Sequence, residues 1–250
     1  MKILSVIFII FIYSIYENKY YKIHNIKIKS EKVHKKVKFI QISDYHLNPF
    51  INLKSLERHI NKFQADFVFL TGDFINRSTR PKDFSKMEDF LKIFSSEVFF
   101  VSGNHEEENK NCSLFFDILN KYHVKLLDNI NVIRGDININ GKFYNGKTCN
   151  LKCFNDKYNI LLIHDPLDFI YNEDKNFDLV LSGHLHGGQV RLPFIGAFID
   201  PYFNLFPKYS KGFYKIRQSI LYITSGMGSK FILRTFNPCE MIFFTLDNED

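Results

Sequence analysis

The 250-residue sequence contains no tryptophan and only four cysteines, which are Cys112, Cys149, Cys153 and Cys239. Four cysteines are too few for a disulfide scaffold in a chain of this size. Cys149 and Cys153 are four positions apart, but the sequence lacks the second cysteine pair that would complete a zinc knuckle. We therefore expect the cysteines to be reduced and to share no site.

A broad basic surface is also missing, because the positive charge is concentrated near the N-terminus. The formal net charge is +6, and 45% of the residues are hydrophobic, which is enough for a core. Residues 1–38 hold nine lysines and two glutamates, a charge of +7, which leaves −1 for the other residues. A nearly neutral domain argues against a groove for long nucleic acid.

The sequence has one long uncharged hydrophobic run, ILSVIFIIFIYSIY at residues 3–16. It is shorter than the roughly 20 residues of a spanning helix, and no small-x-small cleavage site follows it. We expect residues 1–21 to form an uncleaved membrane anchor, with a cleaved signal peptide as the alternative. One lysine precedes the run and many follow it, so the positive-inside rule places the domain at 22–250 on the cytoplasmic side of the inner membrane.

The lysines after this run have two interpretations. A basic cluster beside an anchor is attracted to an anionic membrane surface. The alternation in KIHNIKIK at residues 22–29 predicts instead a strand with a solvated basic face. The two interpretations are compatible.

Strands alternate with helical patterns in the first half of the chain, and strands dominate the second half. We predict strands at 37–43, 66–71, 97–102, 159–164, 178–183, 212–225 and 240–246, and helices at 53–63, 81–94 and about 112–121. Glycine and asparagine turns predict a hairpin within 131–144. This order predicts an α/β fold, a layered sandwich of two sheets flanked by helices.

Polar side chains follow five of the predicted strands, at the point where each strand ends. They are Asp44 and His46, Asp73, Asn104 and His105, His164, and His184 and His186. Sites in α/β sheets form outside the carboxyl ends of strands, so we expect these side chains to converge. Carboxylate, amide and imidazole ligands without a thiolate favour ions such as Mn²⁺, Fe or Zn²⁺, and a pair of ions requires a bridging carboxylate.

The ordered motifs Asp-x-His, Gly-Asp, Gly-Asn-His-Glu, His and Gly-His-x-His resemble those of the calcineurin-like metallophosphoesterases. The resemblance runs from about residue 37 to the C-terminus and includes all five motifs. It implies a four-layer sandwich of two mixed β-sheets flanked by helices. It also implies a metal-dependent phosphoesterase or pyrophosphatase with two divalent ions, of which Mn²⁺ is expected and Fe or Zn²⁺ are alternatives.

The resemblance also implies roles for individual residues. The first ion would be held by Asp44, His46, Asp73 and His186, and the second by Asp73, Asn104, His164 and His184. Asp73 would then bridge the two ions, and a metal-bridging hydroxide would attack phosphorus in line. His105, next to Asn104, would act beside the phosphate as a general acid or a transition-state donor.

One position departs from the pattern of the family. Asn76 stands where some members carry an aspartate that orients the catalytic histidine. An amide stabilises a His105 cation less well, which favours a leaving group of low pKa, such as a phosphoanhydride or an aryl phosphate. Arg77 is predicted to contact the substrate phosphate, with a solvated loop residue as the alternative.

The aromatic segment LPFIGAFIDPYFNLFP at residues 192–207 bears on the substrate. We expect it to line an acyl-chain groove or enter the membrane surface, and the alternative is a buried connector. With the preceding GHLHGGQ motif it resembles a membrane-associated bacterial subgroup, some members of which cleave UDP-2,3-diacylglucosamine in lipid A biosynthesis. A phospholipid or nucleotide-lipid substrate at the membrane surface is therefore expected, and nucleic acid is not. The alternatives are a phosphodiesterase of nucleotides or nucleic acid and a non-catalytic metal-binding scaffold.

Overall fold

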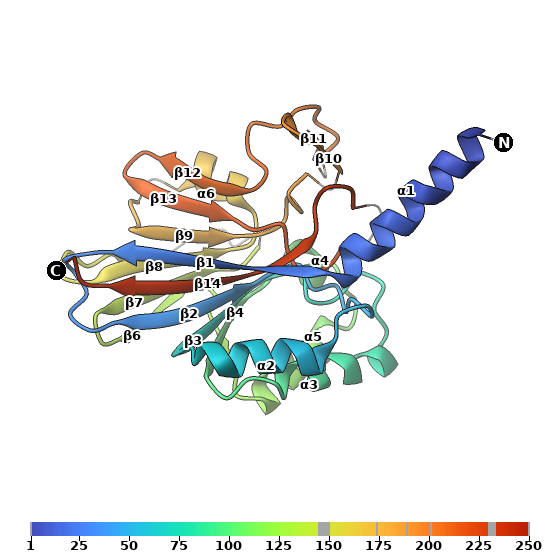
Figure 1. The fold of residues 1–250 in the computed structure, drawn as a ribbon. Helices are drawn as coiled ribbons and strands as arrows, with labels where there is room; N and C mark the ends of the chain where they lie inside the picture. Colours follow the sequence, from blue (N-terminus) through green and yellow to red (C-terminus); the bar gives the residue numbers. More distant parts are fainter. Residues whose placement is uncertain are drawn as a thin grey trace.

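Two six-stranded sheets lie face to face at the centre of the fold (Figure 1). The computed structural model describes residues 2–144, 151–173, 175–188, 190–200, 202–229 and 234–249. The first sheet consists, in spatial order, of β1 (Tyr21–Lys29), β14 (Cys239–Asp247), β2 (Val37–Ile42), β3 (Phe67–Thr71), β4 (Glu97–Val101) and β5 (Lys125–Leu126). The second consists of β12 (Gly212–Ile216), β13 (Ser219–Ile223), β9 (Leu179–Ser182), β8 (Tyr158–Ile163), β7 (Ile137–Lys142) and β6 (Ile130–Arg134).

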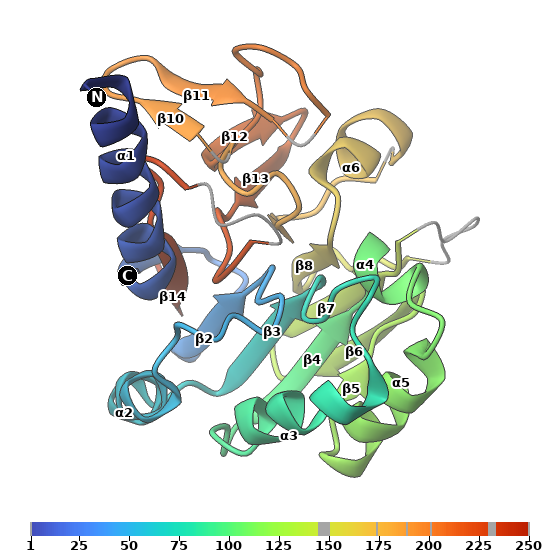
Figure 2. The same cartoon turned by 90° about the vertical axis from the view of Figure 1, so that its right-hand side faces the viewer.

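Helices cover the outer face of each sheet, which makes four layers. The first sheet is covered by α2 (Leu53–Phe63), the short 3₁₀ helix η1 (Pro81–Asp83), α3 (Ser85–Leu91) and α5 (Cys112–Lys121), and the second sheet by α6 (Pro166–Asn172) (Figure 2). Both sheets are mixed, because β14 runs antiparallel to β2 and β12 runs antiparallel to β13. The predicted four-layer sandwich is confirmed.

The strands are hydrophobic on both faces because both faces of each sheet are covered. Phe39 points between the two sheets, where its ring lies 4.8 Å from that of Phe244 and 5.1 Å from that of Phe69. The next residue, Ile40, points to the helices. Many of the 28 phenylalanines are therefore core residues, and their abundance has a structural reason.

Most predicted elements are confirmed, and two predictions are wrong. Residues 81–94 do not form one helix: η1 and α3 divide the segment, and i to i−3 hydrogen bonds from Ile93 and Phe94 end the helical run. Residues 212–225 are not one strand but the hairpin of β12 and β13, which turns at Arg217 with a φ of 55°. Helix α6, which the sequence analysis missed, begins at Pro166 with Asp165 as its N-cap.

The N-terminal helix α1 (Lys2–Lys19) projects from the start of β1 (Figure 1). Its last turn is attached to the domain: Glu17 accepts the backbone N–H of Asn237 at 2.5 Å, and Asn48 donates to the carbonyl of Asn18 at 2.9 Å. Among the side chains of α1 that the structure describes, five apolar ones expose 45–65% of their surface, namely Phe8, Ile9, Phe11, Ile12 and Tyr16. Among the residues that the structure describes, no helix has the length and apolarity needed to cross a membrane.

The basic segment after α1 forms strand β1, as the alternation predicted. Lys27 and Lys29 are exposed, and β1 pairs in parallel with β14. Because β1 runs away from α1, its later lysines lie toward the other end of the molecule (Figure 1). Beyond the strand, Lys32 pairs with Asp178 at 2.7 Å. The lysines are therefore distributed along an edge of the fold and do not gather around α1.

The described cysteines are free, as expected. They are Cys112, Cys153 and Cys239. Cys149 lies outside the described residues.

Candidate metal centre

The carboxyl ends of five strands meet at one edge of the two sheets (Figure 2). Strands β2, β3 and β4 run parallel in the first sheet, and β8 and β9 run parallel in the second. The structure brings together the seven predicted metal ligands here, each exposing at most 8% of its surface: Asp44, His46, Asp73, Asn104, His164, His184 and His186. The convergence that the sequence analysis expected is present.

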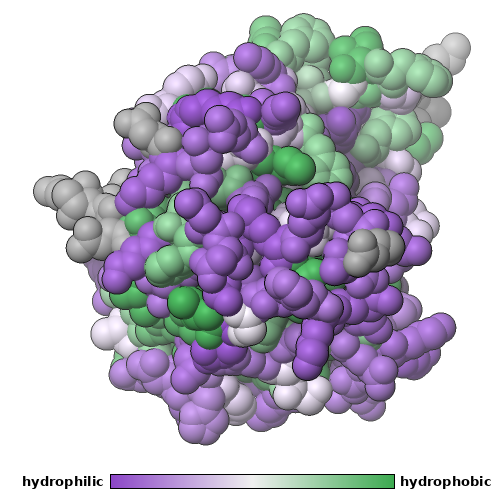
Figure 3. All heavy atoms as spheres, turned by 90° about the vertical axis from the view of Figure 1, so that its left-hand side faces the viewer, coloured by the Kyte–Doolittle hydropathy of each residue, from purple (hydrophilic) through white to green (hydrophobic). Residues whose placement is uncertain are grey.

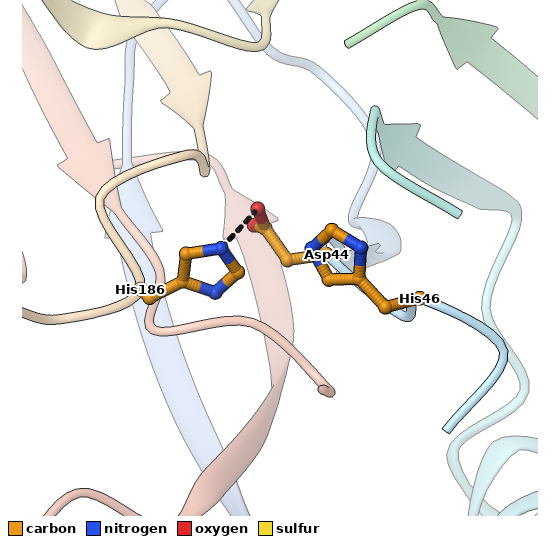
Figure 4. Close-up of side chains that lie close together, drawn as sticks. All are labelled: Asp44, His46 and His186. Atoms are coloured by element: carbon orange, nitrogen blue, oxygen red, sulfur yellow. Dashed lines mark ion pairs between the residues drawn. The ribbon is translucent and has the colours of Figure 1, made fainter. Parts of the chain in front are cut away.

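The first group of ligands contains Asp44, His46 and His186 (Figure 4). One potential ligand atom from each residue lies within 4.8 Å of the others. Nε2 of His186 is 3.7 Å from Oδ1 of Asp44, and the rings of His46 and His186 stack with centroids 5.2 Å apart. The loops after β2 and β9 therefore face each other across this position.

The second group contains Asp73, His164 and His184, and it satisfies the same 4.8 Å limit. Nε2 of His164 is 3.3 Å from Oδ2 of Asp73, and Nδ1 of His184 is 3.0 Å from Nε2 of His164. Oδ1 of Asn104 is buried and accepts no hydrogen bond from any residue that the structure describes. A buried amide oxygen without a donor is suited to bind a cation.

The carboxylate of Asp73 lies between the two groups: it belongs to the second, and it also clusters with His105 and with His46 of the first. Its Oδ2 lies 3.3 Å from His164, 3.8 Å from Nε2 of His46 and 4.0 Å from Nε2 of His105. Its Oδ1 accepts the backbone N–H of His105 at 2.9 Å. Asp73 therefore occupies the place that a bridging carboxylate would need.

The protonation of the histidines suits metal binding. Burial lowers the pKa of His46 to about 3 and that of His184 to about 4, so both rings are neutral, as ligands must be. Burial also opposes the charged form of His164, but the Asp73 carboxylate outweighs it and raises the pKa of His164 to about 10. A cation beside Asp73 would replace that proton as the counter-charge. The nitrogen and oxygen donors present here thus fit two divalent ions.

The backbone at the site is held in an uncommon conformation. Five of the ligands have a positive φ between 48° and 68°, and they are Asp44, His46, Asp73, His184 and His186. A non-glycine residue in this region costs about 1 kcal/mol or more, and such residues cluster at functional sites. The surrounding fold must compensate for this strain.

Two glycines of the motifs are required by close approach. A Cβ at Gly183 would lie 2.3 Å from Oδ2 of Asp44, and a Cβ at Gly103 would lie 2.2 Å from Oδ1 of Asp73. Only glycine lets these loops pass so close to the carboxylates. The Gly-Asn-His-Glu and Gly-His-x-His motifs therefore have a steric reason as well as a chemical one.

Glu106, the last residue of the Gly-Asn-His-Glu motif, has a structural role that was not predicted from the sequence. The buried carboxylate accepts four backbone N–H groups, from Asp73, Phe74, Ile75 and Gly103, at 2.6–3.1 Å. These bonds close the loop after β3 onto the short helix α4 (Asn104–Glu107). Glu106 therefore fixes the position of Asp73. The signal was a carboxylate three residues after a glycine that precedes a helix.

Asn76 does not orient His105, which corrects the interpretation drawn from the sequence. Its Oδ1 lies 3.1 Å from Nδ1 of His46, and its Nδ2 donates to the carbonyl of His46 at 3.2 Å. His105 instead accepts the backbone N–H of Arg77 on Nδ1, at 3.3 Å. The lone pair on Nδ1 places the ring proton of neutral His105 on Nε2, which faces Asp73.

Arg77 lies at the rim of the site. Its Nε forms an ion pair with Glu108 at 2.5 Å, and nearly half of its side chain is exposed. The predicted contact between Arg77 and a substrate phosphate stays a prediction.

Comparisons with known proteins point in the same direction as this geometry. A family model described as calcineurin-like phosphoesterase matches residues 37–188, more than half of the chain. The uncharacterized metallophosphoesterase YkuE of Bacillus subtilis is 26% identical over 84% of this chain and 78% of its own length. The uncharacterized metallophosphoesterase Cj0846 of Campylobacter jejuni is 30% identical over 90% of this chain, which spans 63% of that protein. The UDP-2,3-diacylglucosamine pyrophosphatase LpxG of Chlamydia muridarum is 26% identical over 82% of each protein.

Proposed function

This chain belongs to the calcineurin-like phosphoesterases and is a metal-dependent phosphoester hydrolase, and we propose that it hydrolyses a phosphodiester or pyrophosphate bond of a lipid-linked substrate at the cytoplasmic surface of the inner membrane. The observation that carries the proposal is an exposed apolar face whose elements contact the metal-ligand loops.

The residues around the metal centre divide the chemical work. When bound, two divalent cations neutralise charge that develops on the phosphoryl group and acidify a water molecule. Asp73 would bridge the two positions, and Asn104 contributes its unpaired oxygen to the second. Glu106 keeps Asp73 in place through the backbone of its loop. The protein thus supplies a fixed frame, which is the main requirement for phosphoryl transfer.

His105 serves as a hydrogen-bond donor to the phosphate. Its Nδ1 already accepts the N–H of Arg77, which disfavours the imidazolium form because that form needs a proton on both nitrogens. Its Nε2–H points to the region of Asp73 Oδ2, where phosphoryl oxygens would collect. A donor of this kind stabilises the transition state without protonating the leaving group. A leaving group of low pKa, such as a phosphate, fits this arrangement.

The apolar face has two parts, and the first is the loop that contains β10 (Val190–Leu192) and β11 (Gly196–Ile199). Phe194 and Phe203 are fully or largely exposed, at 109% and 82%. The other exposed apolar residues of this loop are Ile195, Phe198, Leu205 and Phe206. The alternative in which residues 192–207 form a buried connector is therefore wrong.

Helix α1 supplies the second part of the apolar face. The helix and the β10–β11 hairpin rise on the same side of the molecule (Figures 1 and 2), and hydrophobic residues gather at the upper right of Figure 3. The segment around Phe236 connects them: the ring of Phe236 lies 5.5 Å from that of Tyr13, and Thr235 bridges to Val190 of β10. Exposed apolar area of this extent is typical of a membrane or partner contact.

Both parts of the apolar face are linked to the loop that carries His184 and His186, α1 through Asn237 and β11 by direct contact. Asn237 belongs to none of the sequence motifs, but it connects α1 to this loop. Its backbone N–H donates to Glu17 of α1, and its Nδ2 donates to the carbonyl of His186 at 2.6 Å. On the other side, a Cβ at Gly188 would lie 2.4 Å from Cβ of Ala197 in β11. A bilayer against this face would therefore lie close to the metal centre, and a lipid could present its phosphate without leaving the membrane.

The proposed occupant of the apolar face is an anionic bilayer. Lys19 and Lys208 are exposed at the ends of its two parts, where they can contact lipid phosphates. The name of the relative LpxG indicates a diacylated nucleotide-sugar substrate for that protein. We extend this substrate class to the present chain, with UDP-2,3-diacylglucosamine as the specific candidate and lipid A synthesis as the pathway.

The test is hydrolysis of UDP-2,3-diacylglucosamine by the full-length protein in detergent with Mn²⁺. The proposal predicts release of UMP and a lipid monophosphate, and no release by the Asn104→Ala, His184→Ala double variant. Hydrolysis of an aryl phosphodiester without UMP release would contradict the lipid substrate and leave a phosphodiesterase of nucleotides as the alternative. A wild-type protein that hydrolyses neither UDP-2,3-diacylglucosamine nor the aryl phosphodiester would contradict the hydrolytic role.

A further inference from the structure

A tyrosine from the apolar loop reaches the second metal position. The hydroxyl of Tyr202 lies 2.8 Å from Nε2 of His184 and 2.9 Å from Oδ2 of Asp165. The rings of Tyr202 and His184 are 5.4 Å apart. The Tyr202 hydroxyl contacts His184 on the side of the imidazole that faces away from His164 and Asp73, because Nδ1 of His184 is directed at His164.

His184, Tyr202 and Asp165 form a chain of two hydrogen bonds, and the acceptor at its end, Asp165, sets the direction of both. An ionised Asp165 carboxylate only accepts, so the Tyr202 hydroxyl must donate its proton to it. The phenolic oxygen then accepts from Nε2–H of His184. With its proton on Nε2, neutral His184 has the lone pair on Nδ1, directed at the metal position.

The fold fixes Asp165, the residue at the far end of this hydrogen-bond chain. Oδ1 of Asp165 caps helix α6 by accepting the N–H of Leu167 at 2.9 Å, which leaves Oδ2 for Tyr202. Tyr202 is in turn held by Asp200, whose Oδ1 accepts the backbone N–H of Tyr202 at 2.9 Å. The carboxylate and the backbone that carries the phenol are therefore both held in place before any ion binds.

We propose that Tyr202 is a positioning residue which, together with Asp165, sets the tautomer and the ring orientation of His184 and so strengthens the second metal site. The proposal rests on the dimetal centre of the proposed function. It goes beyond the five sequence motifs, because Tyr202 and Asp165 belong to none of the ligand positions. It also means that the loop bearing the exposed Phe203 and Phe206 carries a group that supports a metal ligand.

The experiment compares Mn²⁺ binding by the metal-free full-length protein in detergent with binding by its variants, using calorimetric titration. Tyr202→Phe keeps the ring and removes the hydroxyl. Loss of a hydrogen bond to a metal-ligating histidine typically lowers metal affinity about 10- to 100-fold, and we expect that loss at one of the two sites only. Tyr171→Phe is the matched control, because Tyr171 lies exposed on α6, and it should bind both ions as the wild type does.

Asp165→Asn tests the other end of the same chain. Asparagine keeps the helix cap but replaces the acceptor by an amide that can turn its donor toward the phenol. This variant should weaken the same site, and the double variant with Tyr202→Phe should be no weaker than Tyr202→Phe alone, because both changes break one chain. Additive losses would overturn the proposal.

A second readout does not depend on metal. Nitrogen-15 NMR of the metal-free protein should show neutral His184 with its proton on Nε2 in the wild type. In Tyr202→Phe it should show a mixture of the two neutral tautomers. Unchanged Mn²⁺ affinity and an unchanged tautomer in Tyr202→Phe would overturn the role of Tyr202 while the wild type still binds two ions. A wild type that binds no Mn²⁺ would overturn the dimetal centre itself, together with the role of Tyr202.

Discussion

Asn76 bonds His46 and not His105: its Oδ1 lies 3.1 Å from Nδ1 of the His46 ring, and its Nδ2 donates to the carbonyl of His46 at 3.2 Å. Asn76, three positions after Asp73, therefore supports a member of the first group of predicted ligands. The orientation of His105 depends instead on the backbone of Arg77.

The first prediction concerns the hydrogen bond between Asn76 and His46. Asn76→Ala removes the support of His46 and should weaken one of the two Mn²⁺ sites about 10-fold. The measurement is an Mn²⁺ titration of the full-length protein. Asn111→Ala is a control, because the side chain of Asn111 makes no cap bond to α5. Unchanged Mn²⁺ affinity with a slower turnover would show that Asn76 acts on His105 after all.

The second prediction concerns His105. If its Nε2–H stabilises the phosphoryl group, His105→Ala should lower kcat about 100- to 1,000-fold. The loss should be similar for a series of aryl phosphodiesters whose leaving groups differ in pKa, because the donor does not protonate the leaving group. A loss that grows steeply with the leaving-group pKa would assign His105 the role of general acid.

The third prediction concerns the pH dependence of stability. Burial by itself would raise the pKa of Glu240, but His24 at 3.2 Å, Lys211 and the backbone N–H of Ser225 together lower it from 4.5 to about 2. At a pH between these two pKa values, the unfolded chain binds more protons at Glu240 than the folded chain does. The stabilisation is therefore present above about pH 4.5 and is lost as the pH falls toward 2.

Urea unfolding of the metal-free protein measures this effect. Between pH 5 and pH 3 the wild type should lose about 2 kcal/mol more than Glu240→Gln, which cannot titrate at this position. Glu249→Gln, at the exposed C-terminal end, should behave as the wild type does. Equal losses in the wild type and in Glu240→Gln would show that the ion pair with Lys211 does not hold the carboxylate ionised.

The fourth prediction concerns the apolar face. Replacing Phe194, Phe203 and Phe206 by serine should lower binding to anionic phospholipid vesicles on the order of 1,000-fold, since each phenylalanine loses about 1.5 kcal/mol of burial. Replacing the exposed Ile130 and Ile133 of β6 by serine is the matched control. Vesicle sedimentation measures both. Equal binding by the two variants would place the membrane contact elsewhere.

The convergence of the predicted ligands could be derived from the sequence because each follows an apolar strand, and parallel strands bring their carboxyl ends to one edge. The assignment of Asp44, His184 and the others to two metal positions came from the resemblance to the family. The roles of Glu106, Tyr202 and Asn237 could not be derived in this way, because they depend on contacts between loops distant in sequence. Asn237 reaches His186 across 51 positions, and spacing does not encode that contact.

Hydropathy alone could not distinguish a core strand from a surface loop in residues 192–207. Phe39 and Phe203 belong to equally aromatic stretches, yet Phe39 is fully buried and Phe203 is 82% exposed. The difference arises because β2 lies inside a sheet with both faces covered, whereas the β10–β11 loop has no layer above it. The turn at Arg217 was missed for a similar reason, since an arginine with a positive φ gives no turn signal in the sequence.

Metal analysis of the full-length protein is the sharpest test of a centre in which Asp73 lies between two metal ions. We expect two Mn²⁺ ions per chain in the wild type, loss of phosphodiester hydrolysis on chelation, and recovery when Mn²⁺ is restored. Asp73→Asn should lose both ions and the activity, whereas Asp136→Asn, at the surface turn before β7, should keep them. Hydrolysis that persists after chelation, or two ions retained by Asp73→Asn, would rule out a catalytic centre of two ions at Asp73.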